Sequence, residues 1–456
     1  MRSDLASAVG THRPILNLTS PCRLGFLIGV GVLGLALGQL AGAQATTCTT
    51  GSLPPGNGGD LIVSGGTCTV GAGTFQYHNV NIISGGTLLF TDNKIDFWAE
   101  SILVENTGSL IAGSTTAPIG TADGLVTIHL YGVDQGTSGK AQGITCQTPG
   151  GTCGVPTVLW NSNPMNGLDP TSCVLAQNVN GFNQNLPGNV NDCFYAYMPL
   201  DYDGGGTTPG YFGYKVLALS YGGTLQLFGK KGATYSPSLL PSNSGTSWAR
   251  LNKTIFKGNN TLVLDRAVDW QAGDQIVITT TDYLPGHSET LTIQSVSPPT
   301  KGEVTTLTVT AGVAYEHDGH TYDTGRFVPN GIGPDQDPNV TCSGGQTRCV
   351  ETRAAVGLLT RSIQIVSGGD TLGSSFPASS NCQSGTPPTC SSKPGDCYFF
   401  GGHTLVRQGF QSFQVQGVEF YQLGQGGRIM HYPVHFHMAR QTPTSTYVAD
   451  SRSSIP

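Results

Sequence analysis

The sequence predicts an all-β chain in which short strands repeat along a β-helix or a related solenoid. Glycine contributes 65 of the 456 residues, whereas charged residues make up only 11%. Strong helix formers are scarce, so strands and turns should dominate. Near the N-terminus, a glycine-rich turn recurs as SGGT at 64–67 and 84–87 and as TGSL at 107–110. Its spacing of roughly twenty residues suits one coil of a solenoid whose coils bury their inner faces on one another.

Alternating strands follow these turns, as in TLLF (87–90) and SLIA (109–112). A β-sandwich built of hairpins would give a similar turn spacing, so the repeat leaves both architectures open. Further strands are expected at 215–228, 261–264, 275–280, 305–310 and 356–366.

Three loop-rich segments that carry cysteines interrupt the strands, at 134–213, 329–349 and 370–397. Twelve cysteines are present and all but Cys22 lie beyond the N-terminal segment. In an exported chain they indicate disulfides rather than metal ligands. Three pairs are close enough in sequence to staple loops: Cys146 with Cys153, Cys173 with Cys193, and Cys342 with Cys349. The odd number that remains implies either a free thiol or a partner outside this sequence.

An apolar run at 24–38 follows three arginines and precedes Ala41-Gly42-Ala43. This pattern is typical of a secretory signal peptide, here residues 1–43. Because the run is shorter than a membrane span of about twenty residues, a cleaved signal peptide is favoured. An uncleaved N-terminal anchor is the alternative. We expect a secreted, extracellular chain that meets a membrane only if this segment is not cleaved.

The net negative charge of the chain argues against nucleic acid as a partner. The net charge of −6 becomes −8 when residues 1–43, with three Arg and one Asp, are removed. An acidic chain has no general attraction for nucleic acid, which we therefore do not expect as a partner. An acidic glycan would need a local basic groove or a bridging cation.

Histidines 431, 435 and 437 form the most informative cluster. In a strand, His435 and His437 point to one face and Phe436 to the other. Two imidazoles on one face can bind a metal, transfer a proton or hold a polar substrate. The alternative is a hydrogen-bonded, half-buried pair that only holds a turn.

Four segments resemble, in order, segments of the G8 domain family. They are GGTLQLFGKK with SWARLNKTI (222–231 and 247–255), VDWQAGDQIVITTTDYLPGHSETLTI (268–293), ETRAAVGLLTRSIQI (351–365) and GVEFYQLGQGGRIMHYPVHFHM (417–438). The family includes the cell migration-inducing and hyaluronan-binding protein, a transmembrane hyaluronidase and fibrocystin. The resemblance implies a G8 module at 46–295, with the 134–213 insertion, leading into a right-handed parallel β-helix at 296–456 with disulfide-pinned loops.

The resemblance also implies an extracellular role on glycans and, for the hyaluronidase branch, calcium-dependent depolymerisation of hyaluronan. The fibrocystin branch shares the modules without an established enzyme activity, so catalysis does not follow from the family. This chain has His431 where the family usually has Arg. Family members also continue well beyond this motif, so we expect a truncated β-helix with an open edge.

Catalytic candidates follow from the chemistry of glycan cleavage. Hydrolysis usually uses two carboxyl groups, whereas elimination from a uronic acid uses a base and a group that neutralises the carboxylate. Asp274 and Asp282 are candidate catalytic carboxylates, although on a straight strand they would lie about 26 Å apart. For Asp274 the alternative is a turn residue that accepts backbone N–H groups. His435 and His437 are candidates for acid/base catalysis.

Arg266, Lys230 and Lys231 are candidates for binding a uronate carboxylate, and Trp248 for stacking on a sugar ring. The alternatives are solvated loop charges and a core aromatic. Glu419 and His403 are candidate metal ligands. Calcium, the cofactor that the resemblance implies, prefers oxygen ligands, so the histidines favour acid/base chemistry or a transition metal.

The sequence therefore predicts a hyaluronidase-like depolymerase of acidic extracellular polysaccharides. One alternative is a non-catalytic glycan-binding or adhesion module. Another is a structural protein whose open coil ends self-assemble into filaments. A convergent cluster of acids and histidines in one groove would favour the enzyme. Aromatic platforms without such a cluster would favour the binding module.

Overall fold

The computed structural model describes residues 45–132, 212–220, 222–235, 247–282, 284–297, 304–323, 349–375, 400–407, 409–425, 431–437, 439 and 442–454. Within these ranges the regular structure is β-strand apart from the 3-10 turn η3 (Pro285–His287). The all-β prediction is confirmed. The predicted signal segment and most of the predicted insertions lie outside these ranges.

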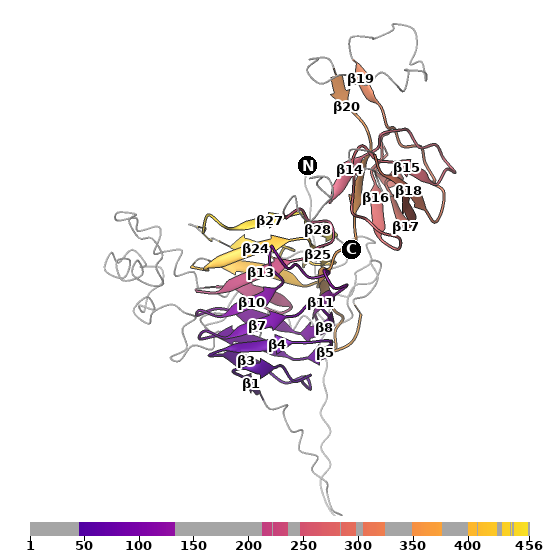
Figure 1. Cartoon of the computed structure of the whole chain (residues 1–456). Coiled ribbons are helices and arrows are strands. Elements are labelled where there is room, and N and C mark those ends of the chain that lie inside the picture. Colours follow the sequence, from indigo (N-terminus) through magenta and orange to yellow (C-terminus); the bar gives the residue numbers. More distant parts are fainter. Residues whose placement is uncertain are drawn as a thin grey trace, which may run out of the picture. The chain divides into compact units, whose positions relative to one another are not determined.

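Three parallel sheets contain most of the described strands (Figure 1). Sheet A contains β1 (Thr46–Cys48), β3 (Leu61–Ser64), β6 (Asn79–Ile83), β9 (Ser101–Val104), β12 (Val216–Leu219), β23 (His403–Arg407) and β26 (Phe436–His437). Sheet B contains β2 (Gly51–Ser52), β4 (Thr67–Val70), β7 (Thr87–Phe90), β10 (Ser109–Ala112), β13 (Thr224–Phe228), β24 (Ser412–Gln416) and β27 (Tyr447–Ala449). Sheet C contains β5 (Gly73–Gln76), β8 (Lys94–Ala99), β11 (Leu125–Leu130), β22 (Ile363–Ser367), β25 (Val418–Tyr421) and β28 (Arg452–Ser454).

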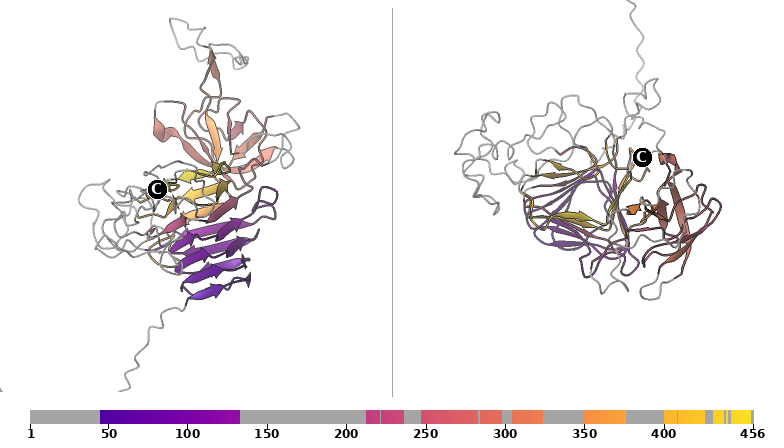
Figure 2. Two further views of the ribbon diagram at one scale, coloured as in Figure 1. Left: turned by 90° about the vertical axis from the view of Figure 1, so that its left-hand side faces the viewer. Right: turned by 90° about the horizontal axis from the view of Figure 1, so that it is seen from above.

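The chain visits these sheets in turn, and each strand pairs in parallel with the strand one coil away. This is a parallel β-helix. Seen from above in Figure 2, its strands overlie one another around one interior. In β7 and β10 every second residue is buried, as the sequence alternation predicts. The interior holds a continuous apolar core in which Phe97 lies 5.3 Å from Phe90, centroid to centroid.

An antiparallel sheet is inserted between β13 and β22. It contains β14 (Trp248–Arg250), β21 (Ala355–Leu358), β16 (Gln275–Ile278), β17 (Glu289–Ser297), β18 (Thr306–Val309) and β15 (Thr261–Val263), in that order. A separate two-stranded ribbon joins β19 (Thr321–Asp323) to β20 (Cys349–Glu351). The antiparallel sheet has its own core, which includes the buried Trp270.

The expected boundary at 296 falls within β17 of the antiparallel sheet. Parallel coils begin at β1, and the described strands from β14 to β21 pair antiparallel. The alternation of side chains could not reveal this, because parallel and antiparallel strands share the same period of two.

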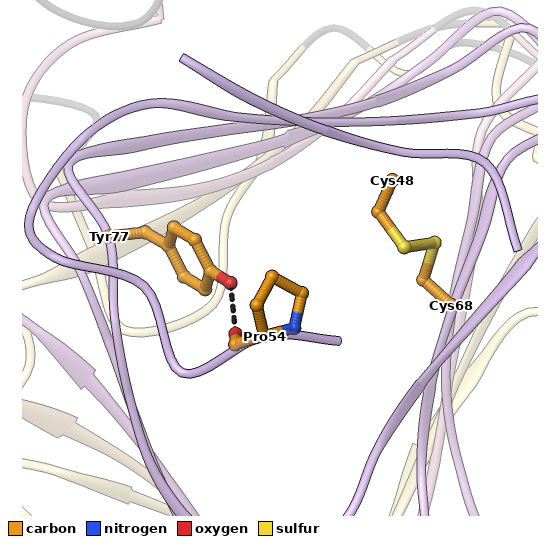
Figure 3. Close-up of a disulfide and its surroundings, with 4 residues drawn as sticks. All are labelled: Cys48, Pro54, Cys68 and Tyr77. Carbon is orange, nitrogen blue, oxygen red and sulfur yellow. Dashed lines mark hydrogen bonds between the residues drawn. A yellow bond between two sulfur atoms is a disulfide. The ribbon is translucent and has the colours of Figure 1, made fainter. Parts of the chain in front are cut away.

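One disulfide is present in the described residues, between Cys48 of β1 and Cys68 of β4 (Figure 3). Nearby, the Tyr77 hydroxyl donates to the carbonyl oxygen of Pro54. This disulfide was not among the predicted pairs. Those pairs involve Cys146, Cys153, Cys173, Cys193 and Cys342, which lie outside the described residues, together with Cys349 in β20.

A polar clip connects three successive coils. Asp60, His78 and Glu100 precede β3, β6 and β9, and the His78 ring contacts Asp60 at 2.9 Å and Glu100 at 2.7 Å. The hydrogen bond to Glu100, followed by the other contacts with these carboxylates, raises the pKa of His78 to about 9. The pKa of His78 is higher in the folded chain than in the unfolded chain. The stabilisation of the fold by protonated His78 is therefore complete below pH 6.5 and is lost as the pH rises through 9.

The free energy of unfolding of the wild type should fall between pH 6.5 and 9, and we expect that fall to be smaller in His78→Gln. Since His78 is half exposed, the difference from wild type should be only about 1 kcal/mol. Urea unfolding at several pH values measures it. An unchanged pH profile in the variant would contradict the assignment.

Candidate functional site

His435 and His437 lie together, as the alternation predicts. In β26, Phe436 pairs with Val406 of β23, and its ring packs edge-on against Phe413 of the core at 5.0 Å. The two histidines flank Phe436 on the opposite side, with ring centroids 5.3 Å apart. His437 pairs with Arg407 across the strands.

Two further imidazoles lie at the start of β23 and before β26. The ring centroids of His403 and His431 are 4.4 Å apart, and both residues are buried. His403 Nδ1 lies 3.2 Å from the side-chain nitrogen of Gln425. We call His403, His431, His435 and His437 the histidine face.

Burial keeps two of these histidines neutral. Desolvation lowers the pKa of His403 well below its usual value, and the charge of His431 adds to this effect. The pKa of His437 falls to about 4, through desolvation and then through the positive charge of Arg407. At neutral pH each of these two rings is therefore a neutral imidazole with one N–H donor and one acceptor nitrogen.

The two predicted metal ligands do not meet. Glu419 lies on β25 of sheet C, where it accepts a hydrogen bond from Gln364 at 2.7 Å and pairs with Arg452 at 3.0 Å. His403 lies on β23 of sheet A. Across the described ranges, no group of three or more His, Cys, Asp or Glu side chains is arranged to hold a metal ion.

Asp274 and Asp282 lie at opposite ends of β16 and do not form a pair. Asp274 is buried, accepts the Gln271 N–H at 2.9 Å and forms an ion pair with Lys231. It therefore has the features of the turn residue that was the alternative interpretation. Asp282 is exposed, and its pKa is lowered to about 2, chiefly by the hydrogen bond from Thr280.

Trp248 and Arg266 form a surface cluster on the antiparallel sheet. The alternative interpretation of Trp248 was a buried core aromatic, but its side chain is 45% exposed. The guanidinium groups of Arg250 and Arg266 lie 5.4 and 5.6 Å from its ring. Arg266 also pairs with the adjacent Asp265. This cluster offers an aromatic platform flanked by cations.

A cavity of about 490 Å³ is lined by several charged side chains. Four cations and two carboxylic acids line it: Lys94, Lys230, Lys231, Arg361, Asp123 and Asp269. We call this the cationic cavity. Two of the predicted substrate-binding residues, Lys230 and Lys231, are in it. Arg361 and Asp269 were missed by the sequence reasoning, although both lie in segments that carry the family resemblance.

The cavity forms where the chain leaves the β-helix and returns to it. Lys230 and Lys231 follow β13, and the Lys230 N–H donates to the Ile119 carbonyl at 2.8 Å. Arg361 lies just before β22, and its guanidinium donates to the carbonyl oxygens of Leu358 at 2.7 Å and Asp450 at 3.0 Å. Backbone carbonyl groups thus hold the Arg361 guanidinium in place.

Asp269 is the unusual group in this cavity. Its Oδ1 is buried and forms no hydrogen bond with any residue that the structure describes. Burial raises the pKa of Asp269 to about 6, and the nearby charge of Asp274 adds to the rise. The carboxyl therefore changes its charge close to physiological pH.

Comparison with known proteins finds two family models that match parts of this chain. The family model for the G8 domain matches residues 48–151, and that for the CEMIP beta-helix matches residues 399–455. The resemblance to G8 domain proteins is confirmed. The β-helix match covers β23 to β28, and so contains the whole histidine face.

The relatives are long proteins. A Dictyostelium discoideum protein is 27% identical over 238 residues, which is 50% of this chain and 16% of the relative. A G8 domain-containing protein from the same organism is 28% identical over 267 residues, or 57% of this chain and 13% of the relative. Human fibrocystin-L is 29% identical over 223 residues, which is 44% of this chain and 4% of fibrocystin-L. The chain thus spans 16% or less of each of these three.

The two matched domains indicate an extracellular protein related to glycans or adhesion. Within the ranges that the structure describes, no helix is both long and apolar enough to cross a membrane.

Proposed function

We propose that this chain is a secreted protein that binds a carboxylated polysaccharide of the hyaluronan type in the cationic cavity. The observation that carries the proposal is the placement of four cationic side chains around one cavity in a chain with a net charge of −6. Lysine and arginine side chains are the usual protein ligands of carboxylates. The cavity volume of about 490 Å³ falls within the range of small-molecule sites.

Binding of hyaluronan oligosaccharides tests this proposal directly. We expect the purified chain to bind them at low salt, with affinity falling as salt screens the charges, and to bind a neutral polysaccharide much more weakly. Equal affinity for both polysaccharides would contradict the proposal. Each titration is run with calcium and with a chelator, because the family resemblance implies a calcium-dependent activity.

Depolymerisation of the bound glycan is the second candidate function. The adjacent His435 and His437 favour it, because two imidazoles on one face can transfer a proton to or from a substrate. Shorter products would support this activity. Ultraviolet absorbance from an unsaturated uronate would then distinguish elimination from hydrolysis.

If the chain cleaves glycans, we expect His435→Ala and His437→Ala each to slow cleavage by about 100-fold or more, because general acid–base groups contribute rate factors of that size. His320→Ala is the matched control, since His320 lies outside the histidine face and bonds to Asp318. Cleavage by both variants at the wild-type rate would exclude the histidine face from catalysis.

A further inference from the structure

Asp269 poses a problem for a cavity that binds anions. Its carboxyl lines the cationic cavity, and when ionised it repels a ligand carboxylate and neutralises one of the four surrounding cations. Among the described residues its buried Oδ1 has no hydrogen-bond donor, although a hydrogen bond from the Asp269 backbone N–H to the carboxyl lowers the pKa and so opposes the effect of burial. A buried carboxylate oxygen without a donor is costly, whereas a neutral carboxyl group is tolerated far better. The site therefore favours the protonated form of Asp269.

The charged groups around Asp269 come from every element at the cavity. Asp274, in the antiparallel insert, opposes ionisation, while Lys230 and Arg361 favour it. Lys231 is already engaged by Asp274. Lys94 of β8 and Asp123 before β11 line the same cavity. Negative and positive charges thus shift the pKa of the Asp269 carboxyl in opposite directions.

We infer that Asp269 recognises the acidic ligand in its protonated form, donating its carboxyl proton in a hydrogen bond to a carboxylate oxygen of the sugar. The inference rests on the proposed function and adds to it a specificity-determining residue and a pH preference. A hydrogen bond from a hydroxyl donor to a carboxylate is among the strong classes of hydrogen bond. The sugar carboxylate stays ionised at mildly acidic pH, because free carboxyl groups titrate near pH 4.

The pKa of about 6 sets the size of the effect. Only about one molecule in 26 has a protonated Asp269 at pH 7.4, against about nine in ten at pH 5.0. When binding requires the protonated form, the apparent dissociation constant is the intrinsic one divided by that fraction. We therefore expect hyaluronan oligosaccharides to bind about 20-fold more tightly at pH 5.0 than at pH 7.4.

The decisive comparison uses Asp269→Asn, which stays neutral at every pH and keeps a hydrogen-bond donor. Dissociation constants for hyaluronan oligosaccharides are measured between pH 7.4 and pH 5.0. We expect the variant to bind at pH 7.4 about as tightly as wild type does at pH 5.0, and to lose the pH dependence. Asp123→Asn removes another carboxyl from the same cavity and should keep the wild-type pH dependence.

A second measurement needs no variant. If the ligand selects protonated Asp269, whose pKa is about 6, binding at pH 6.5 takes up about 0.8 proton, as follows from the linkage of protonation and binding. Calorimetry in buffers of different ionisation enthalpy measures this uptake.

The outcomes separate the two proposals. Failure of wild type to bind the oligosaccharides at any pH would overturn the proposed function itself. Binding that is equally tight at pH 7.4 and pH 5.0, that takes up no proton, or that keeps its pH dependence in Asp269→Asn would overturn only the role of Asp269.

Discussion

Replacing Gly108 by alanine is expected to destabilise the β-helix by about 3 kcal/mol or more, at the upper end of the usual cost of overpacking. A Cβ atom at Gly108 would lie 2.0 Å from the Ile82 carbonyl oxygen and 2.5 Å from its carbon. These are backbone atoms of the preceding coil, which cannot rotate away as a side chain could. The coils would have to separate locally, and the hydrogen bond from Thr224 N–H to the Gly108 carbonyl would weaken.

The same geometry recurs in other coils. A Cβ at Gly66, Gly86 or Gly223 would lie 2.3, 2.3 or 2.4 Å from a backbone carbonyl oxygen one coil away. The glycines at 66, 86 and 108 belong to the turn repeat seen in the sequence. Their recurrence therefore records the close approach of successive coils.

Urea unfolding of Gly108→Ala and wild type measures the loss. Gly71→Ala is the matched control, because a Cβ at Gly71 meets no atom within 4 Å. A Gly108→Ala protein as stable as the control would show that the turns can separate without cost.

The coiled architecture was predictable because its causes are local. The glycine turns at 64–67, 84–87 and 107–110 and the alternation in TLLF and SLIA each depend on a few neighbouring residues. The antiparallel insert was not predictable in the same way. Its β16 pairs with β21, far away in sequence, and the alternation of its side chains resembles that of the parallel strands.

In the candidate site, too, the features that depend on neighbouring residues were predictable and those that depend on distant strands were not. The common face of His435 and His437 follows from the period of a strand, and the structure has it. The expected meeting of His403 and Glu419 required knowledge of the sheet that each strand joins, and they join different sheets. Asp269 and Arg361 meet at the cavity only because the chain leaves the β-helix and comes back.

The cationic cavity gives the largest predicted effect on ligand binding. Lys230→Glu should weaken the binding of hyaluronan oligosaccharides by about 100-fold, because a hydrogen bond to a charged group contributes roughly 1.5–3 kcal/mol and the new carboxylate repels the ligand. Lys230 is exposed at the cavity and, among the described residues, forms no ion pair. Lys231→Ala should have a smaller effect, since the ammonium group of Lys231 is already held by Asp274.

The charge reversal needs a control that changes the net charge equally. Lys257→Glu provides it, because Lys257 is an exposed lysine of the antiparallel insert that does not line the cavity. We expect Lys257→Glu to bind almost as wild type does, and Lys230→Glu to show a shallower dependence of affinity on salt. If both variants lose affinity equally, the ligand senses only the overall charge of the chain and the cavity is not its site. If only Lys230→Glu loses affinity, the carboxylated glycan contacts the cavity itself.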